Sequence, residues 1–383
     1  MTEPSPLPLP ATDDASIAAL TDAYFKRTRA IVEMFGDVEV TYAVFMRRPV
    51  LFAGKPAIDW LQAVAAARGT RFVIEPRYAE GDWVGAGEPM LYITGSFAAL
   101  VELETLYLQK IGAACVAAFN AYSMCCEMPK VAFLAMEARH TTGPEMMALM
   151  AYAAAVGSAA AKRAVGARGF IGGANDATAG FFGATAGLGT MPHALIGYAG
   201  STVRAAEMFV AANPGVPLTI LPDYYGREIS DSLEVCRRFP EMAGEGRLSV
   251  RLDTHGGRFL EGLDPQASYA VLERHAPGSF RQYRTEEELK WLVGTGVSAA
   301  AVFRLREALD AAGYGAVKIV ASSGFGPAKC KVMASVAAPI DVVGTGSFLP
   351  EDWRETYATA DIVRYGDRQS VKIGREFLLR ERD

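Results

Sequence analysis

The stretch Gly189-Thr190-Met191-Pro192-His193-Ala194-Leu195-Ile196 contains one of the chain's four histidines and ends in a short apolar run. The polar turn Arg139-His140-Thr141-Thr142 precedes it, and Arg251-Leu252-Asp253-Thr254-His255 follows at the end of another apolar run. Polar clusters that recur after successive apolar runs are typical of a barrel, whose active site forms at the carboxyl ends of its strands. Because an imidazole titrates near neutral pH, His193 is the first candidate for proton or phosphoryl transfer.

From residue 131 onward, short apolar runs alternate with segments of helical pattern. The expected strands cover residues 131–136, 168–171, 194–196, 218–221, 248–252, 317–321 and 340–343. Helices are expected between them, including residues 144–161, 202–212, 229–238, 286–292 and 299–312. Nearly continuous apolar strands that alternate with helices indicate a parallel sheet with both faces covered. We therefore expect an α/β fold in which residues 126–350 form a (β/α) barrel, irregular or incomplete, as the catalytic domain.

The part of the chain before residue 126 has a different order of expected helices and strands. Its patterns indicate helices at 15–35, 56–67 and 98–119, a strand at 38–47, and strands with Gly-Asp turns at 72–95. This predicts an α+β N-terminal lobe over residues 13–125, opened by Asp13 or Asp14 as a helix cap. The tail, residues 351–383, carries two short strand patterns and is expected to return to this lobe. The proline-rich residues 1–12 lack the features of a signal peptide and predict a disordered start.

Composition excludes several classes of protein. The formal net charge of −5 and the absence of long basic runs argue against a nucleic-acid partner. Five cysteines without a CxxC pair predict neither a disulfide framework nor a zinc site, so we expect a reducing, cytoplasmic location. The apolar run at 146–161 is short for a bilayer span and predicts a buried helix, with no membrane association.

The residues that follow the expected strands are the candidate site. They are Arg139, His140 and Thr141 after the first strand, Asn175 after the second, His193 beside the third, Asp223 after the fourth, Arg251 and Asp253 at the fifth, Ser322, Ser323 and Gly324 after the sixth, and Gly344, Thr345 and Gly346 after the seventh. Glycine-rich turns at the last two strands allow backbone N–H groups to approach a ligand closely, and such loops often hold a phosphate in barrels.

The order of these motifs resembles the nicotinate phosphoribosyltransferases of the short archaeal and bacterial type, within the type II phosphoribosyltransferase family. The closest match is the stretch from Gly189 to Ile196 quoted above. Further similar segments are Thr21-Asp22-Ala23-Tyr24-Phe25-Lys26-Arg27-Thr28, Glu137-Ala138-Arg139-His140, Gly172-Gly173-Ala174-Asn175-Asp176, Pro222-Asp223, Arg251-Leu252-Asp253-Thr254 and Val343-Gly344-Thr345-Gly346.

This resemblance implies transfer of a phosphoribosyl group from phosphoribosyl pyrophosphate to nicotinate in NAD biosynthesis or salvage, coupled to ATP hydrolysis. It implies that ATP phosphorylates His193 and that Arg251 and Asp253 meet the ribose and pyrophosphate. Magnesium is expected with the pyrophosphate, on Asp253 and Asp223, because Mg²⁺ usually binds one or two carboxylates plus substrate phosphates.

The resemblance also assigns the remaining residues. Gly324 and the turn Gly344-Thr345-Gly346 would hold the 5′-phosphate, and Arg139 would lie near the pyridine and the pyrophosphate. Tyr24 would reach the pyridine ring in the neighbouring subunit's site, which implies a homodimer with a shared active site.

Two alternatives stay open. Quinolinate phosphoribosyltransferases read Arg-Lys-Thr-Thr-Pro-Gly where this chain reads Arg139-His140-Thr141-Thr142-Gly143-Pro144, so a decarboxylating enzyme for quinolinate is the first. The second is a catalytically silent paralogue that binds a phosphosugar. It is suggested by Asp253-Thr254-His255-Gly256-Gly257, where many nicotinate enzymes read Asp-Ser-Gly-Asp.

Overall fold

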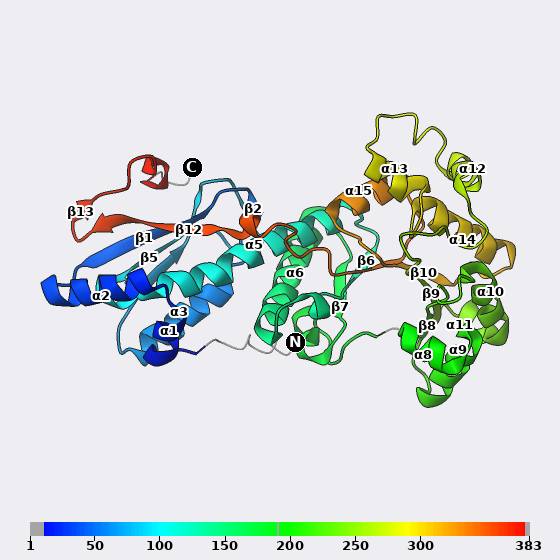
Figure 1. Ribbon diagram of the computed structural model, residues 1–383, viewed down its shortest axis with the longest axis horizontal. Coiled ribbons are helices and arrows are strands. Elements are labelled where there is room, and N and C mark those ends of the chain that lie inside the picture. Colours follow the sequence, from blue (N-terminus) through cyan, green and yellow to red (C-terminus); the bar gives the residue numbers. More distant parts are fainter. Residues whose placement is uncertain (1–10, 190, 380–383) are drawn as a thin grey trace. The chain divides into compact units, whose positions relative to one another are not determined.

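The computed structural model describes residues 11–189 and 191–379, so residues 1–10 of the expected disordered start lie outside the described residues. The chain divides into two compact units (Figure 1). The first comprises Met1–Ser123, Arg139–Arg163 and Phe348–Asp383, and the second comprises Met124–Ala138 and Ala164–Ser347. Residues 139–163, which the sequence-based division gave to the barrel domain, belong to the first unit, because their helix packs closely on a helix of that unit.

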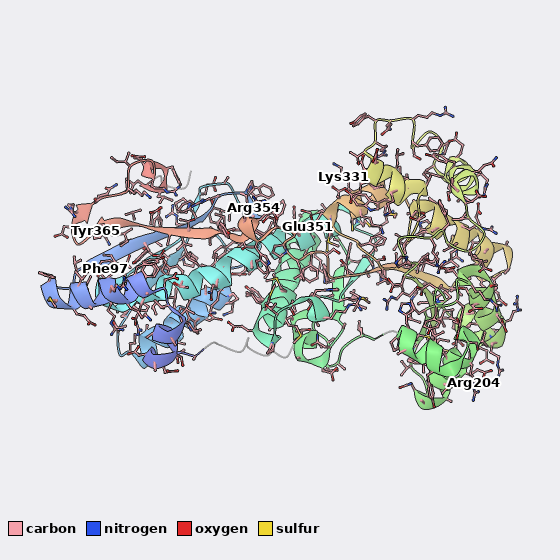
Figure 2. The ribbon with its side chains drawn as sticks, in the orientation of Figure 1. Phe97, Arg204, Lys331, Glu351, Arg354 and Tyr365 are labelled. Carbon is pink, nitrogen blue, oxygen red and sulfur yellow. The ribbon has the colours of Figure 1, made fainter. Side chains whose placement is uncertain are left out.

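The first unit is built on a five-stranded antiparallel sheet with the order β13-β12-β1-β5-β3. Its strands are β1 (Glu39–Met46), β3 (Val73–Pro76), β5 (Pro89–Ser96), β12 (Ala358–Tyr365) and β13 (Arg368–Gln369), with β2 (Val50–Leu51) and β4 (Trp83–Val84) paired separately. Strand β12 pairs with β1 along its length, so the end of the chain completes a sheet that the beginning starts. Phe97 and Tyr365 meet edge to face at this sheet, with ring centroids 6.3 Å apart (Figure 2).

Six helices of the described residues belong to the first unit. They are α1 (Asp14–Leu20), α2 (Ala23–Phe35), α3 (Lys55–Ala67), α4 (Phe97–Leu100), α5 (Glu104–Glu127) and α6 (Pro144–Val165), the ends of α5 and α6 running past the unit's bounds. Asp13 caps α1, accepting a hydrogen bond from the Ser16 amide at 2.9 Å. The single helix expected at 15–35 is wrong, because Thr21 leaves the helix to donate its hydroxyl to the Glu102 carbonyl.

The second unit contains six parallel strands in the order β7-β6-β11-β10-β9-β8. They are β6 (Ala132–Ala135), β7 (Gly169–Gly173), β8 (Leu218–Ile220), β9 (Leu248–Leu252), β10 (Lys318–Ala321) and β11 (Val342–Thr345). All five pairings are parallel. Neighbours in this order follow a barrel's cycle except at β7 and β8, which form the two edges. The expected α/β fold with an incomplete barrel is thereby confirmed.

The strand expected at 194–196 is wrong. These residues lie in helix α8 (His193–Ala199), which starts after Pro192 and ends at Gly200 with a left-handed φ of 79°. Proline at a helix start and glycine just past its end are a recognised helix signature, which the short apolar run obscured. The barrel is open at this point of the chain, between β7 and β8.

The other helices of the second unit pack on its parallel strands or on other helices. These helices are α7 (Asp176–Ala179), α9 (Thr202–Ala212), α10 (Glu228–Arg238), α11 (Pro240–Gly244), α12 (Pro265–His275), α13 (Glu286–Val293), α14 (Ala299–Ala311) and α15 (Pro327–Ser335). Among them, α9, α10 and α14 pack on the strands, and α12 and α13 pack on other helices.

Short 3-10 turns occur in both units, at Val101–Leu103, Ala138–His140, Gly180–Phe182, Trp353–Thr356 and Glu376–Leu379. Within the described ranges, no helix is long and apolar enough to cross a bilayer.

Helices α5 and α6 pack closely because α6 has a glycine at their contact. A Cβ atom on Gly157 would lie 2.8 Å from the Tyr122 amide nitrogen and 3.0 Å from the Ala121 Cβ, and it would also overlap the Ala118 carbonyl. Backbone atoms of a neighbouring helix cannot move aside as a flexible side chain can, so any larger residue must separate the helices.

Gly157→Ala is therefore expected to destabilise the protein by about 1–3 kcal/mol, the usual cost of overpacking. Gly244→Ala is the control, since nothing lies within 4 Å of a Cβ atom there. That control should be neutral or stabilising by up to about 1 kcal/mol. Urea denaturation measures both, and equal midpoints for the two variants would contradict the packing account.

Candidate active site

Arg251, Asp253 and Ser322 join the carboxyl ends of two neighbouring strands, β9 and β10. The Arg251 Nη2 donates to Asp253 Oδ2 at 2.8 Å, and its Nε donates to the Ser322 hydroxyl at 3.0 Å. The same hydroxyl lies 2.9 Å from Asp253 Oδ1. Parallel pairing that sets Val320 opposite Arg251 brings these side chains together. A cation, a carboxylate and a hydroxyl are thus held together by mutual hydrogen bonds at the strand ends.

The two glycine-rich loops after β10 and β11 are tied to each other. Thr345 donates its hydroxyl to the Phe325 carbonyl at 2.6 Å and accepts the Ser347 amide at 2.8 Å. Ser323 and Gly324 have left-handed backbones, with φ of 76° and 70°, and both are exposed. No atom lies within 4 Å of a Cβ position on Gly324, so a ligand can reach this loop.

Gly344 leaves room for the side chain of Met136. A Cβ atom there would lie 2.7 Å from the Met136 Cε atom. The space beside this glycine is therefore filled by a side chain from the end of the neighbouring strand β6 rather than left open. Its partner in the predicted phosphate turn, Gly346, follows β11 directly.

His193 forms a pair with Asp223. Its Nε2 lies 3.0 Å and 3.1 Å from the two carboxylate oxygens. The Asp223 side chain is 8% exposed and the His193 side chain 42%, so a buried carboxylate orients an accessible imidazole. Gly197 allows α8 to approach the loop after β8, because a Cβ atom there would lie 2.8 Å from the Tyr224 hydroxyl.

Two residues that sequence reasoning missed hold this pair in place. Arg258 donates to the Asp223 carbonyl at 2.9 Å and forms an ion pair with Glu228, which is fully buried. Glu228 also accepts the Thr254 hydroxyl at 2.9 Å. Long side chains that reach between loops leave no periodic signal in a sequence, although the Gly256-Gly257 step before Arg258 marks an unusual loop.

Asn175 has a structural role in the second unit. Its Oδ1 caps α7 by accepting the Thr178 amide at 3.1 Å. The buried Nδ2 atom has no hydrogen-bond partner among the described residues.

Four predicted site residues belong to the first unit. Arg139 and His140 lie in a 3-10 turn, where the Arg139 Nε is 3.3 Å from the His140 Nε2, and Thr141 follows directly. Tyr24 lies on α2 with 58% of its surface exposed.

Glu137 is a buried carboxyl just beyond β6. It is 1% exposed, and neither of its carboxyl oxygens has a hydrogen-bond partner in the described part of the chain. Burial raises the pKa of Glu137 to about 7. Sequence reasoning noted this position only as part of a motif, because burial without a partner cannot be recognised from sequence.

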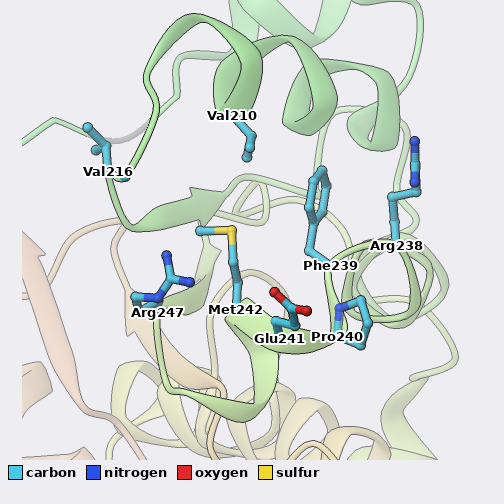
Figure 3. Close-up of a pocket in the computed structure, with 9 residues that line it drawn as sticks. Val210, Val216, Arg238, Phe239, Pro240, Glu241, Met242 and Arg247 are labelled. Atoms are coloured by element: carbon cyan, nitrogen blue, oxygen red, sulfur yellow. The ribbon is translucent and has the colours of Figure 1, made fainter.

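A cavity of about 430 Å³ lies elsewhere in the second unit, between Val210, Val216, Arg238, Phe239, Met242 and Arg247 (Figure 3). Val216 and Arg247 come just before β8 and β9, so this cavity is at the amino ends of those strands. It is separate from the strand ends that carry Asp223 and Asp253. Within residues 11–189 and 191–379, no group of three or more His, Cys, Asp or Glu side chains is arranged to hold a metal ion.

Comparison with known proteins shows the fold of the chain and a family likeness of its N-terminal part. Residues 22–115 match the family model described as quinolinate phosphoribosyl transferase, N-terminal domain. No curated protein sequence matches the chain. Nicotinate-nucleotide pyrophosphorylase from Pyrococcus furiosus has a similar structure, with 24% identity and a TM-score of 0.67, over 94% of this chain and 79% of that one.

Two further structures extend the likeness. Human nicotinic acid phosphoribosyltransferase aligns at 16% identity and a TM-score of 0.56, over 92% of this chain and 76% of that one. Nicotinate-nucleotide pyrophosphorylase from Ehrlichia chaffeensis aligns at 15% identity and a TM-score of 0.53, over 85% and 88%. The chain therefore has the fold of these proteins, and its residues 22–115 are similar to the N-terminal domain of quinolinate phosphoribosyl transferases.

Replacing the Glu137 carboxyl should change how stability depends on pH. Because its folded pKa of about 7 exceeds the ordinary 4.5, the unfolded chain releases this proton first, and stability falls as pH rises through that window. Glu137→Gln is expected to gain stability over the wild type by on the order of 3 kcal/mol between about pH 4.5 and pH 7. Urea denaturation across this range is the measurement, with exposed Glu351→Gln as control. A wild-type-like pH slope in Glu137→Gln would show that Glu137 is ionised without cost.

Proposed function

We propose that the chain transfers a phosphoribosyl group from phosphoribosyl pyrophosphate to nicotinate, giving nicotinate mononucleotide and pyrophosphate in NAD biosynthesis, with ATP hydrolysis coupled. The observation that carries this proposal is the set Arg251, Asp253 and Ser322 at the strand ends beside the open Ser323-Gly324 loop. It offers a cation, a carboxylate and accessible backbone amides together, which suits a phosphorylated sugar. The fold shared with phosphoribosyltransferases supports the same reaction class.

The reaction requires placement and charge rather than covalent chemistry from the protein. As pyrophosphate leaves the anomeric carbon, positive charge develops on the ribose and negative charge on the leaving group. Arg251 is placed to stabilise the leaving pyrophosphate, and Asp253 to accept ribose hydroxyls or to face the developing positive charge. Their mutual ion pair keeps both side chains in position before the substrate binds.

Magnesium would come with the pyrophosphate. A carboxylate has about four acceptor sites, of which Asp253 uses two, for Arg251 and Ser322. It can therefore contribute one ligand to a Mg²⁺ that is otherwise held by substrate phosphates and water, the usual arrangement for this ion. Bound there, Mg²⁺ would neutralise the leaving pyrophosphate. Asp223 is engaged by His193, and we assign it to that histidine first.

The His193–Asp223 pair favours ATP coupling. When the neutral imidazole donates a hydrogen bond from Nε2–H to Asp223, its other nitrogen, Nδ1, carries a lone pair. That lone pair is then free to attack a phosphoryl group, and the Asp223 carboxylate keeps the ring oriented. The exposed position of the imidazole makes it accessible to a nucleotide.

The resemblance also suggests residues for the pyridine. We assign Arg139, with His140 and Thr141 beside it, to the pyridine carboxylate, since an arginine can bind a carboxylate bidentately. Tyr24 would serve the neighbouring subunit of a homodimer. Its helix supports such a partner, because Ile31, Met34 and Phe35 on α2 are 56%, 77% and 81% exposed. Large exposed apolar patches usually mark interaction surfaces.

Quinolinate is the second candidate acceptor. The match of residues 22–115 to the quinolinate phosphoribosyl transferase N-terminal domain favours it. That reaction needs further cations for a second carboxylate and releases carbon dioxide, whereas it has no evident use for the His193–Asp223 pair.

A product assay with phosphoribosyl pyrophosphate and Mg²⁺ separates these readings. Nicotinate, quinolinate and nicotinamide are offered separately, each with and without ATP. Mononucleotide from nicotinate, formed faster with ATP, is the expected result. Carbon dioxide release from quinolinate would show that quinolinate is the acceptor. No product from any acceptor would favour a catalytically silent protein that binds a phosphosugar.

Substitution of the histidine tests the coupling separately. His193→Ala is expected to keep basal transfer to nicotinate and to lose its stimulation by ATP, and Asp223→Asn should weaken that stimulation by misorienting the imidazole, by about 10-fold or more. Initial rates with and without ATP give the ratio. Full ATP stimulation in His193→Ala would remove this histidine from phosphoryl transfer.

A further inference from the structure

Lys329 is a buried lysine behind the glycine loop that follows β10. It lies in the first turn of α15 with 5% of its surface exposed. Its Nζ donates to the Ser323 carbonyl at 2.8 Å and lies 4.3 Å from the centroid of the Phe325 ring. No carboxylate of the described residues forms an ion pair with it. Burying a cation without an anion is costly, so such a site suggests that the anion is a ligand.

The hydrogen bond from Lys329 holds Ser323 in an unfavourable backbone conformation. Ser323 is not glycine, yet it has a φ of 76°, a conformation that costs a β-carbon-bearing residue about 1 kcal/mol or more. Its carbonyl is held by the ammonium. The amides of Ser323, Gly324 and Phe325 donate to no acceptor in the part of the chain that the structure describes. The loop thus has its carbonyl satisfied from behind and its amides unused.

We propose that Lys329 is a positioning residue for a phosphate loop: it holds the Ser323 carbonyl so that the amides of residues 323–325 can bind a phosphate monoester, whose charge it neutralises from within the fold. This inference rests on the proposed function, in which that ester is the 5′-phosphate of phosphoribosyl pyrophosphate. It adds a residue that no strand-end motif contains.

The charge of Lys329 is sensitive to pH. Its pKa is lowered to about 8, chiefly by burial and also by Lys290 on α13, while Cys330 and Asp253 at the end of β9 act in the opposite direction. Since the protonated amine is the form that attracts phosphate, affinity for a phosphate ester should fall as pH rises through about 8.

Binding of ribose 5-phosphate, measured by titration calorimetry, tests the proposal without requiring turnover. The variants are Lys329→Met, which keeps the length of the side chain, Lys329→Arg, and the control Lys331→Met, which removes an exposed lysine of the same helix (Figure 2). Lys329→Met is expected to bind at least about 10-fold more weakly, an effect typical of losing a charge-assisted contact, and to lose the pH dependence. Lys329→Arg should regain part of the affinity, and Lys331→Met should bind like the wild type.

Thermal unfolding distinguishes this role from a structural one. Removal of a buried, unpaired ammonium should leave the melting temperature of Lys329→Met unchanged or raise it, whereas a residue needed for folding would lower it. With phosphoribosyl pyrophosphate and the preferred pyridine, KM for the phosphosugar should rise more than kcat falls.

The possible failures are distinct. If the wild type and Lys329→Met bind ribose 5-phosphate equally well, the inference is wrong and the proposed function is unaffected. If the wild type binds ribose 5-phosphate with the expected dependence on Lys329 but forms no nucleotide from any pyridine, the proposed function is wrong and the inference stands. If the wild type binds no phosphate ester, both are wrong.

Discussion

The ion pair between Arg251 and Asp253, with Ser322 bonded to both, is the constraint on which the candidate site depends. It exists because β9 and β10 are parallel neighbours and end at the same edge of the sheet. The bridge holds a cation and a carboxylate side by side, and in the proposed function both would meet the pyrophosphate end of the phosphosugar. It also fixes the start of the Ser323-Gly324 loop, since Ser322 is the last residue before that loop turns into the left-handed region.

The gap in the barrel between β7 and β8 determines where the His193–Asp223 pair lies. Strands β7 and β8 are edges, and the chain between them forms α8 and α9 instead of a strand. Helix α8 begins at His193, which places this imidazole at a helix end where Asp223 from the next loop can orient it. Arg258 then fixes the backbone of Asp223 from a third loop. A closed barrel with a strand at 194–196 would have put His193 before a strand, without these contacts.

Sequence patterns predicted the features that repeat and missed those that depend on one long side chain. Six of the expected parallel strands are present, because alternation of apolar strands and helices has a strong signal, and the glycine loops after the last two strands follow from composition. The helix at 193–199 was mistaken for a strand because three apolar residues fit either structure. Arg258, Glu228, Lys329 and the burial of Glu137 were missed, because a contact across loops or a buried charge becomes visible only in three dimensions. Gly344 has a packing reason that the sequence did not show, since Met136 fills the space beside it, and its part in phosphate binding stays a prediction.

Lys329 and Glu137 are buried ionisable residues of the second unit without an ion pair among the described residues, and each lies just beyond or behind a strand end. Folding alone gives no reason to keep an unpaired ammonium or carboxyl in such places, and for Lys329 we propose a phosphate ester as the reason. The most direct measurement is a crystal structure with phosphoribosyl pyrophosphate and Mg²⁺. The account predicts the 5′-phosphate against the amides of Ser323 and Gly324 and the pyrophosphate beside Arg251 and Asp253. A phosphosugar bound elsewhere, for example in the cavity between Val210 and Arg247, with the Arg251–Asp253 pair unchanged and without ligand contact, would contradict it.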